Sequence, residues 1–176
     1  MTAMKTTSKV SGKTIAHFSG HETFPLRQMW LKKAFDQAIN GGLIRKSVFT
    51  DENAISEFGV GKNMVASIRH WALACGLMYE KSDEFRVGSL AREIFQDGGL
   101  DPYAESPSTA WLAHWQLAGY CLRSTTWYWL FNHVTTPSFT RQELEEPLAS
   151  YARMLNPKHR LCLLYTSDAA DDSLRV

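Results

Sequence analysis

Short polar and basic side chains recur at helical spacing near the middle of the chain. Asn63, Ser67 and His70 are spaced to lie on one face of a helix, and Lys62 and Arg69 flank them. Amide, hydroxyl and imidazole groups can hydrogen-bond to base edges in the major groove of DNA, whereas lysine and arginine bind phosphates. The segment therefore predicts contact with double-stranded DNA through these five side chains.

The helix that must present them is predicted over 62–75. Its opposite face is apolar, with Val65, Ile68, Ala72 and Cys75 at the spacing of a packed stripe. One side of the helix is therefore expected to pack into a core while the polar side stays open to solvent.

The neighbouring elements are predicted from capping and turn residues. Thr50 or Asp51 can cap a shorter helix that runs to about Phe58, and the glycine-rich turn 59–61 suits two helices that meet at a steep angle. After the second helix, two short apolar segments surround the polar residues 80–84, which is typical of a β-hairpin.

Helix, glycine turn, helix and hairpin in this order are typical of a winged helix-turn-helix. In such a fold Lys81 and Arg86 of the hairpin would add contacts to phosphates. The alternative is that the same fold packs against another protein and does not bind DNA at all.

The whole chain is expected to be mainly α, with this small β-hairpin. The predicted organisation is a flexible leader over 1–14, a winged helix-turn-helix domain with an N-terminal helix over 15–100, and a Trp-rich helical subdomain over 101–161. Further helices are predicted by apolar spacing and by capping residues over 27–39, 89–96, 106–119 and 140–154.

Two other chemistries fit the residues less well. A phosphate loop would need glycine where Ser56 stands and a hydroxyl residue after Lys62, and neither is present. His17, His21 and Glu22 resemble half of a metal site, but no second half follows them. We therefore expect no metal site and no cofactor.

The aromatic residues of the second half could stack bases, as they do in single-strand binding proteins. Aromatic residues at helical spacing more often belong to a core, and a core position is the expectation for Trp111, Trp115, Trp127 and Trp129. His114 has no paired nucleophile or carboxylate in a known signature, so a buried structural histidine is expected there. No catalytic residues are predicted, and we do not expect an enzyme.

Composition favours an ordinary globular protein of the cytoplasm. The chain has 176 residues and a net charge of +1, without a signal peptide or a segment long enough to span a membrane. Cys75, Cys121 and Cys162 are odd in number and widely separated, which favours free thiols over disulfides or zinc ligands.

The last residues have a different character. The run 162–172 matches the conceptual translation of a transposase sequencing adapter, so 162–176 is expected to be foreign and the native protein to continue beyond about Leu161. Without this tail the chain loses three acidic residues and one basic residue, which leaves a net charge of +3.

Several uncommon strings resemble one family. They are 18–27 (FSGHETFPLR), 59–71 (GVGKNMVASIRHW), 101–103 (DPY) and 125–132 (TTWYWLFN). Between about Phe18 and Met154 the chain resembles the bacterial domain of unknown function 4007 family. The resemblance implies an association with phosphoadenosine-phosphosulfate-reductase-like proteins and with DNA sulfur-modification or phage-defence systems. It implies no catalytic residues.

Together these observations predict a DNA-binding accessory or regulatory protein of a prokaryotic DNA-modification or defence system. The alternative is a scaffold that docks a reductase-like or nuclease partner and does not bind DNA itself.

Overall fold

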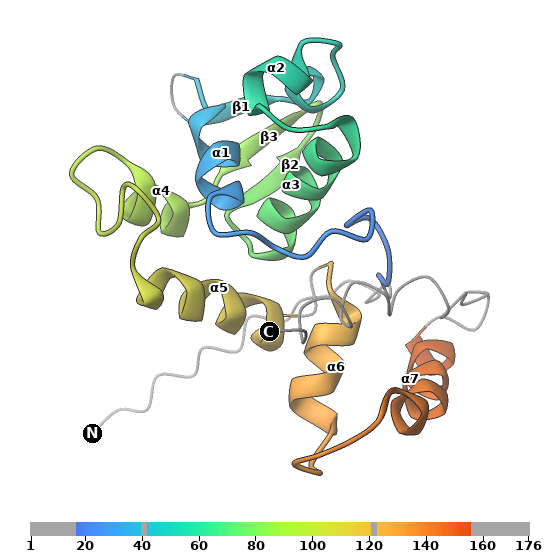
Figure 1. Ribbon diagram of the computed structural model, residues 1–176. Helices are drawn as coiled ribbons and strands as arrows, with labels where there is room; N and C mark the ends of the chain where they lie inside the picture. Colours follow the sequence, from blue (N-terminus) through green and yellow to red (C-terminus); the bar gives the residue numbers. More distant parts are fainter. Residues whose placement is uncertain (1–16, 40–41, 121–122, 156–176) are drawn as a thin grey trace.

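The computed structural model describes residues 17–39, 42–120 and 123–155 (Figure 1). The predicted leader 1–14 and tail 162–176 lie outside these ranges, as do Cys121 and Cys162. The described part is mainly helical with a small antiparallel sheet, which confirms the predicted class. Its elements are, in chain order, α1 (Trp30–Asp36), β1 (Leu43–Arg45), the 3-10 helix η1 (Lys46–Phe49), α2 (Ala54–Phe58), α3 (Lys62–Ala74), β2 (Met78–Lys81), β3 (Glu84–Val87), α4 (Ser89–Phe95), α5 (Pro107–Gly119), α6 (Thr125–His133) and α7 (Arg141–Leu155).

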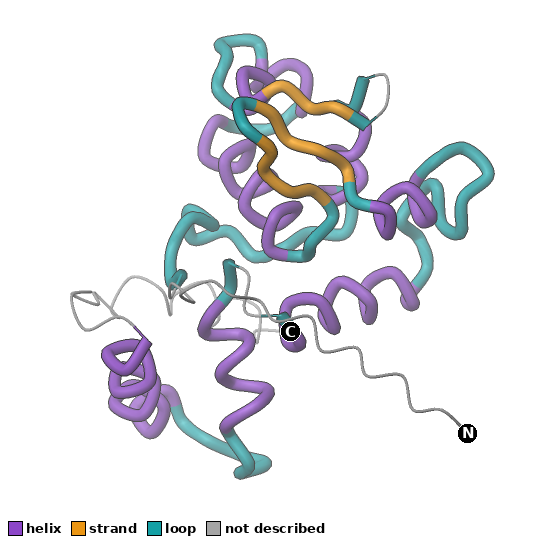
Figure 2. Tube along the Cα trace, turned by 180° about the vertical axis from the view of Figure 1, so that it is seen from behind, coloured by secondary structure: helices purple, strands orange, loops and turns teal. Residues whose placement is uncertain are grey.

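The predicted hairpin is present and a third strand extends it. β2 and β3 pair antiparallel, and β1 pairs with the other edge of β3, so the strand order is β1-β3-β2. The sequence does not predict β1, because three residues are too few to show an alternating pattern. Helices α1 and α3 lie on one face of the sheet, and Figure 2 shows that no described helix covers the other face.

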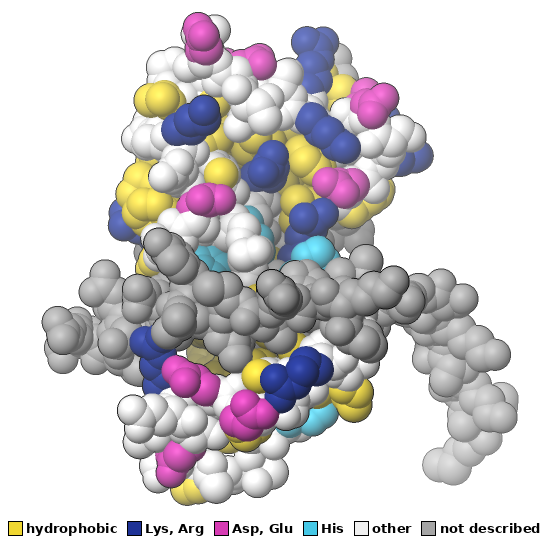
Figure 3. Space-filling view, turned by 90° about the vertical axis from the view of Figure 1, so that its right-hand side faces the viewer, with side chains coloured by type: hydrophobic (Ala, Val, Ile, Leu, Met, Phe, Trp, Pro, Cys, Tyr) yellow, Lys and Arg dark blue, Asp and Glu magenta, His cyan; other side chains and the backbone are white. Residues whose placement is uncertain are grey.

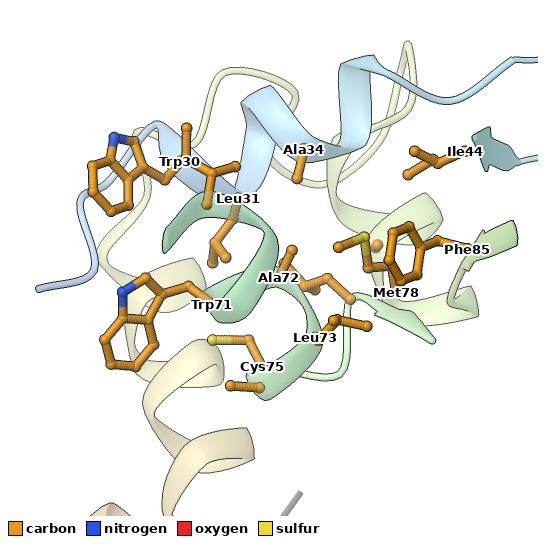
Figure 4. Close-up of a cluster of buried hydrophobic side chains, with 14 of the residues drawn as sticks. Trp30, Leu31, Ala34, Ile44, Trp71, Ala72, Leu73, Cys75, Met78 and Phe85 are labelled. Atoms are coloured by element: carbon orange, nitrogen blue, oxygen red, sulfur yellow. The ribbon is translucent and has the colours of Figure 1, made fainter. Parts of the chain in front are cut away.

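The main core forms around α3, whose predicted apolar face is fully buried. Val65, Ile68, Ala72 and Cys75 are all at most 2% exposed. They pack among side chains from α1 and from the strands, as Figure 4 shows for Leu31, Ala34, Met78 and Phe85 among others. Because each buried aliphatic or aromatic side chain contributes about 1.5 to 3 kcal/mol, this contact fixes α3 firmly in place.

The turn between α2 and α3 depends on one glycine. Gly59 ends α2 with a left-handed backbone (φ 63°), a conformation that glycine adopts without steric cost. Gly61 precedes α3 with an ordinary extended backbone. Only Gly59 is therefore needed for the change of direction.

Helices α5 and α7 begin at the predicted caps. The Ser106 side chain accepts a hydrogen bond from the backbone N–H of Ser108 (3.2 Å), and Pro107 occupies the first turn. The Glu143 carboxylate accepts from the backbone N–H of Thr140 (2.6 Å), as expected of a capping box. This hydrogen bond, together with one from the Thr140 hydroxyl, lowers the pKa of Glu143.

The aromatic residues of the second half divide between core and surface. Trp129 is 6% exposed and Trp127 is half-buried, but Trp111 is 71% and Trp115 68% exposed. The expectation of a core position is therefore wrong for the two tryptophans of α5. They stand one helical turn apart on a face that no described residue covers well.

No helix in the described part of the chain is long and apolar enough to cross a membrane.

Candidate nucleic-acid interface

One side of α3, from Lys62 to Arg69, presents a basic, open surface. Lys62 and Asn63 are exposed, and Ala66 and Arg69 are half-buried along the same side of the helix. α3 contains no acidic residue, and no side chain caps its amino terminus. A Cβ atom placed on Gly61 would meet nothing within 4 Å, so the space before the helix is free. The exposed N–H groups and the two cations together favour a negatively charged partner.

Two of the predicted contact residues do not belong to this surface. Ser67 is fully buried and His70 is 6% exposed, so the prediction that they face bases is wrong. The physical reason is that residues 17–28 run across this side of α3 and cover it (Figure 1). Asn63 alone of the three short polar side chains stays open to solvent.

The covering segment is held to α3 by specific hydrogen bonds. The Ser67 hydroxyl lies 2.6 Å from the carbonyl oxygen of His21, to which it can donate, and Trp71 Nε1–H donates to the carbonyl oxygen of Phe24 (3.0 Å). The rings of His21 and Trp71 stack, with centroids 5.9 Å apart. At its start the segment also meets α6, where the backbone N–H of His17 donates to Thr125 Oγ1 (2.8 Å).

The electrostatics of the covered side favour neutral imidazoles. Burial lowers the pKa of His70 to about 4, and nearby cationic groups act in the same direction. Burial also lowers the pKa of His21. At neutral pH both rings are therefore uncharged, and neither offers a cation to a phosphate.

The hairpin brings a further basic group near its turn. Lys81 is exposed at the end of β2, and Lys46 Nζ donates to the carbonyl oxygen of Ser82 (3.1 Å) in the turn itself. The sequence did not indicate Lys46, because its place beside the hairpin depends on the short strand β1. Figure 3 shows Lys and Arg side chains, with Asp and Glu side chains between them, on the side of the molecule where α2 and α3 lie.

Arg86 is placed differently from the prediction. Its neighbour Phe85 points into the core, so Arg86 points to the opposite face of the sheet, away from α3. It is half-buried, with its NH2 group 3.3 Å from Glu84 Oε2. Arg86 therefore does not share a surface with Lys62 and Arg69.

Among the described residues, no group of three or more His, Cys, Asp or Glu side chains is arranged to hold a metal ion. Cys75 is fully buried, and burial raises the pKa of its thiol to about 12, so it is an unreactive core residue.

A family model for proteins of unknown function, DUF4007, matches residues 18–163. The chain belongs to this family. The resemblance inferred from the sequence is thereby confirmed over the region that carries the quoted strings. A search of curated proteins found no match.

Two solved structures resemble this DUF4007 chain in sequence and in fold. The first is a crystal structure of magnesium-ion-bound SspB, which matches this chain with 28% sequence identity and a TM-score of 0.73. The match covers 87% of this chain and 47% of the SspB chain. A second SspB crystal structure has 27% identity and a TM-score of 0.74, over 89% of this chain and 49% of that one. The chain thus spans about half the length of the SspB chains.

Proposed function

We propose that this DUF4007 protein is a DNA-binding accessory or regulatory subunit of a prokaryotic DNA sulfur-modification or phage-defence system. The order of α2, a glycine turn, α3 and the β2-β3 hairpin supports a winged helix-turn-helix, in which the second helix contacts the duplex. The modification or defence context is an implication of the family and does not depend on the site.

The observation that carries the proposal is the open half of α3. Lys62 and Arg69 stand on one exposed side with no carboxylate on the helix, and the uncapped amino terminus adds partial positive charge in the same place. Phosphates of a duplex would meet Lys62 and Arg69, and Asn63 is the remaining side chain of this helix suited to a base edge. Lys46 would contact the backbone from beside the hairpin tip, whereas the predicted contact Lys81 lies on the same outer face of the sheet as Arg86.

The test is duplex binding as a function of salt for Lys62→Ala and Arg69→Ala. Each variant should weaken binding and reduce the slope of log K against log salt by about 1, because one phosphate contact releases about one counterion. Lys32→Ala is the matched control, since that lysine lies on α1 and pairs with Asp36. Unchanged affinity and slope in both α3 variants would reject the proposal.

A second function is favoured by the exposed tryptophans of α5. Trp111 and Trp115 are large aromatic residues of the kind enriched at the centres of protein interfaces. They support a scaffold that docks a phosphoadenosine-phosphosulfate-reductase-like or nuclease partner. In this case a Trp111→Ala, Trp115→Ala double variant should lose a purified partner while Lys62→Ala retains it, and wild-type protein should ignore DNA at low salt.

A further inference from the structure

A cavity of about 300 Å³ lies where the covering segment meets α3, α5 and α6. Flat rings make up much of its lining, with Trp71 and His70 from α3, His21 from the covering segment, and His114 and Trp127 from α5 and α6. Ser19, Ser124 and Thr126 add hydroxyl groups to the lining, and Arg123 adds a guanidinium group. The volume is at the lower end of the range for ligand pockets, so a single small planar molecule would fill it.

Apart from Arg123, the hydrogen-bonding side chains of the lining carry hydroxyl, imidazole or indole groups. His21 Nδ1 is buried and has no hydrogen-bond partner, although buried polar atoms in folded proteins are nearly always satisfied. His114 Nδ1 accepts a hydrogen bond from Trp127 Nε1–H (3.2 Å), which leaves Nε2 as the donor of this ring. The site therefore offers both donors and acceptors between aromatic faces.

We infer that this cavity is a binding pocket for a nucleobase. A base has two flat faces that stack on indole and imidazole rings, and its edge carries neutral donors and acceptors that match those of the lining. An inorganic anion fits less well, because the charged side chain of the lining, Arg123, already pairs with Glu80 (3.2 Å).

The position of the pocket links it to the proposed DNA contact, and this inference deepens that proposed function. His70 and Trp71 directly follow Arg69 along α3, so the cavity lies behind the helix whose open side would approach the duplex. A base could come from DNA, swung out of the stack, or from a free nucleoside. The two sources share the chemistry that the pocket recognises and are separated by experiment.

The first arm titrates the four free nucleosides into the whole protein by calorimetry. Wild-type protein should bind at least one of them, and Ala110→Phe should weaken that binding by about tenfold or more, because a phenyl ring on this cavity-lining position of α5 occupies the pocket. Ser108→Phe is the matched control, on the same helix but outside the lining, and should bind like wild type. His21→Phe keeps a ring against Trp71 but removes the hydrogen-bonding atoms, and should also weaken binding by about tenfold.

The second arm uses a duplex that contains 2-aminopurine, whose fluorescence depends on the rings that stack on it. Wild-type protein should change the fluorescence, because the base leaves its neighbours in the duplex for the rings of the pocket, and Ala110→Phe should bind the duplex with unchanged affinity but without the change. Nucleoside binding without a fluorescence change would support the pocket and assign it to free ligand. Failure of both signals, or inorganic phosphate binding as tightly as any nucleoside, would overturn the inference. If duplex binding itself is absent, the proposed function fails, and the nucleoside titration still tests whether the cavity binds a base.

Discussion

The two sides of α3 have similar polarity in the sequence, but one side is open to solvent in the structure and the other is covered. Lys62, Ala66 and Arg69 lie on the open side, whereas Ser67 and His70 lie under residues 17–28. The difference arises from a segment some forty residues earlier in the chain, and helical spacing alone does not reveal it. A polar side chain at the right period is therefore a candidate for contact only if no distant segment satisfies it first.

The two sides should also differ in what they contribute. On the covered side Ser67 and Trp71 hydrogen-bond to the covering segment and His21 stacks on Trp71, so substitutions there should cost stability. On the open side the cations have solvent in front of them, so substitutions should change binding and leave stability nearly intact.

The largest effect is expected for Trp71→Ala. Trp71 is 8% exposed, stacks on His21 and donates to the carbonyl oxygen of Phe24, so its removal leaves a cavity and releases the covering segment. We expect a loss of about 3 to 5 kcal/mol in the free energy of unfolding, measured by urea denaturation. The control is Trp115→Ala, a tryptophan that is 68% exposed, for which the loss should stay within about 0.5 kcal/mol. If Trp71→Ala lost as little unfolding free energy as Trp115→Ala, the covering segment would not depend on Trp71.

The second effect is a loss of stability in mild acid. The pKa of His70 is about 4 in the folded protein and about 6.5 in the unfolded chain, so the unfolded state binds the proton more tightly. The stability that the neutral ring provides is complete above the unfolded value and is lost as the pH falls from there towards about 4. Between about pH 7 and about pH 5 we expect a loss of about 2 kcal/mol from His70, and the lowered pKa of His21 adds to it in the same direction.

Comparison with His70→Gln separates the contribution of His70 from the loss of stability that other titrating groups cause in acid. The variant should lose about 2 kcal/mol less than wild type over the same pH interval, measured by denaturation at each pH. An unchanged pH dependence in His70→Gln would contradict the burial of a neutral ring. The groups that face His70 and shape this response are His17, His21, Arg69 and Arg123.

Local patterns predicted the fold better than they predicted the surface. The apolar stripe of α3, the caps at Ser106 and Thr140 and the hairpin all follow from spacings within a dozen residues, and all are present. Strand β1 is not predicted from the sequence because it is only three residues long and forms by pairing with β3, about forty residues later in the chain.

The candidate site shows the same division between local and distant information. Lys62, Asn63 and Arg69 stay on the open side because the helical period places them opposite the core. The burial of Ser67 and His70 and the cavity behind α3 depend on contacts between distant segments. The exposure of Trp111 and Trp115 likewise could not follow from aromatic spacing, which is the same for a core and for an interface.

The smallest expected effect is on the unfolding free energy of variants at two adjacent residues, Ser67 on the covered side of α3 and Ala66 on the open side. Ser67→Ala removes a hydrogen bond to the carbonyl oxygen of His21 (2.6 Å) and should cost about 1 kcal/mol of unfolding free energy. The His21 carbonyl keeps its second donor, the backbone N–H of Phe24, so the loss stays near that of one hydrogen bond. Ala66→Ser makes the reverse change on the half-buried open side and should cost about 0.5 kcal/mol, the helix propensity difference alone. Amide hydrogen exchange should distinguish the two further, because only Ser67→Ala loosens the covering segment and speeds exchange at the Phe24 N–H. Faster exchange in neither variant would show that the Ser67 hydroxyl does not hold residues 17–28 against α3.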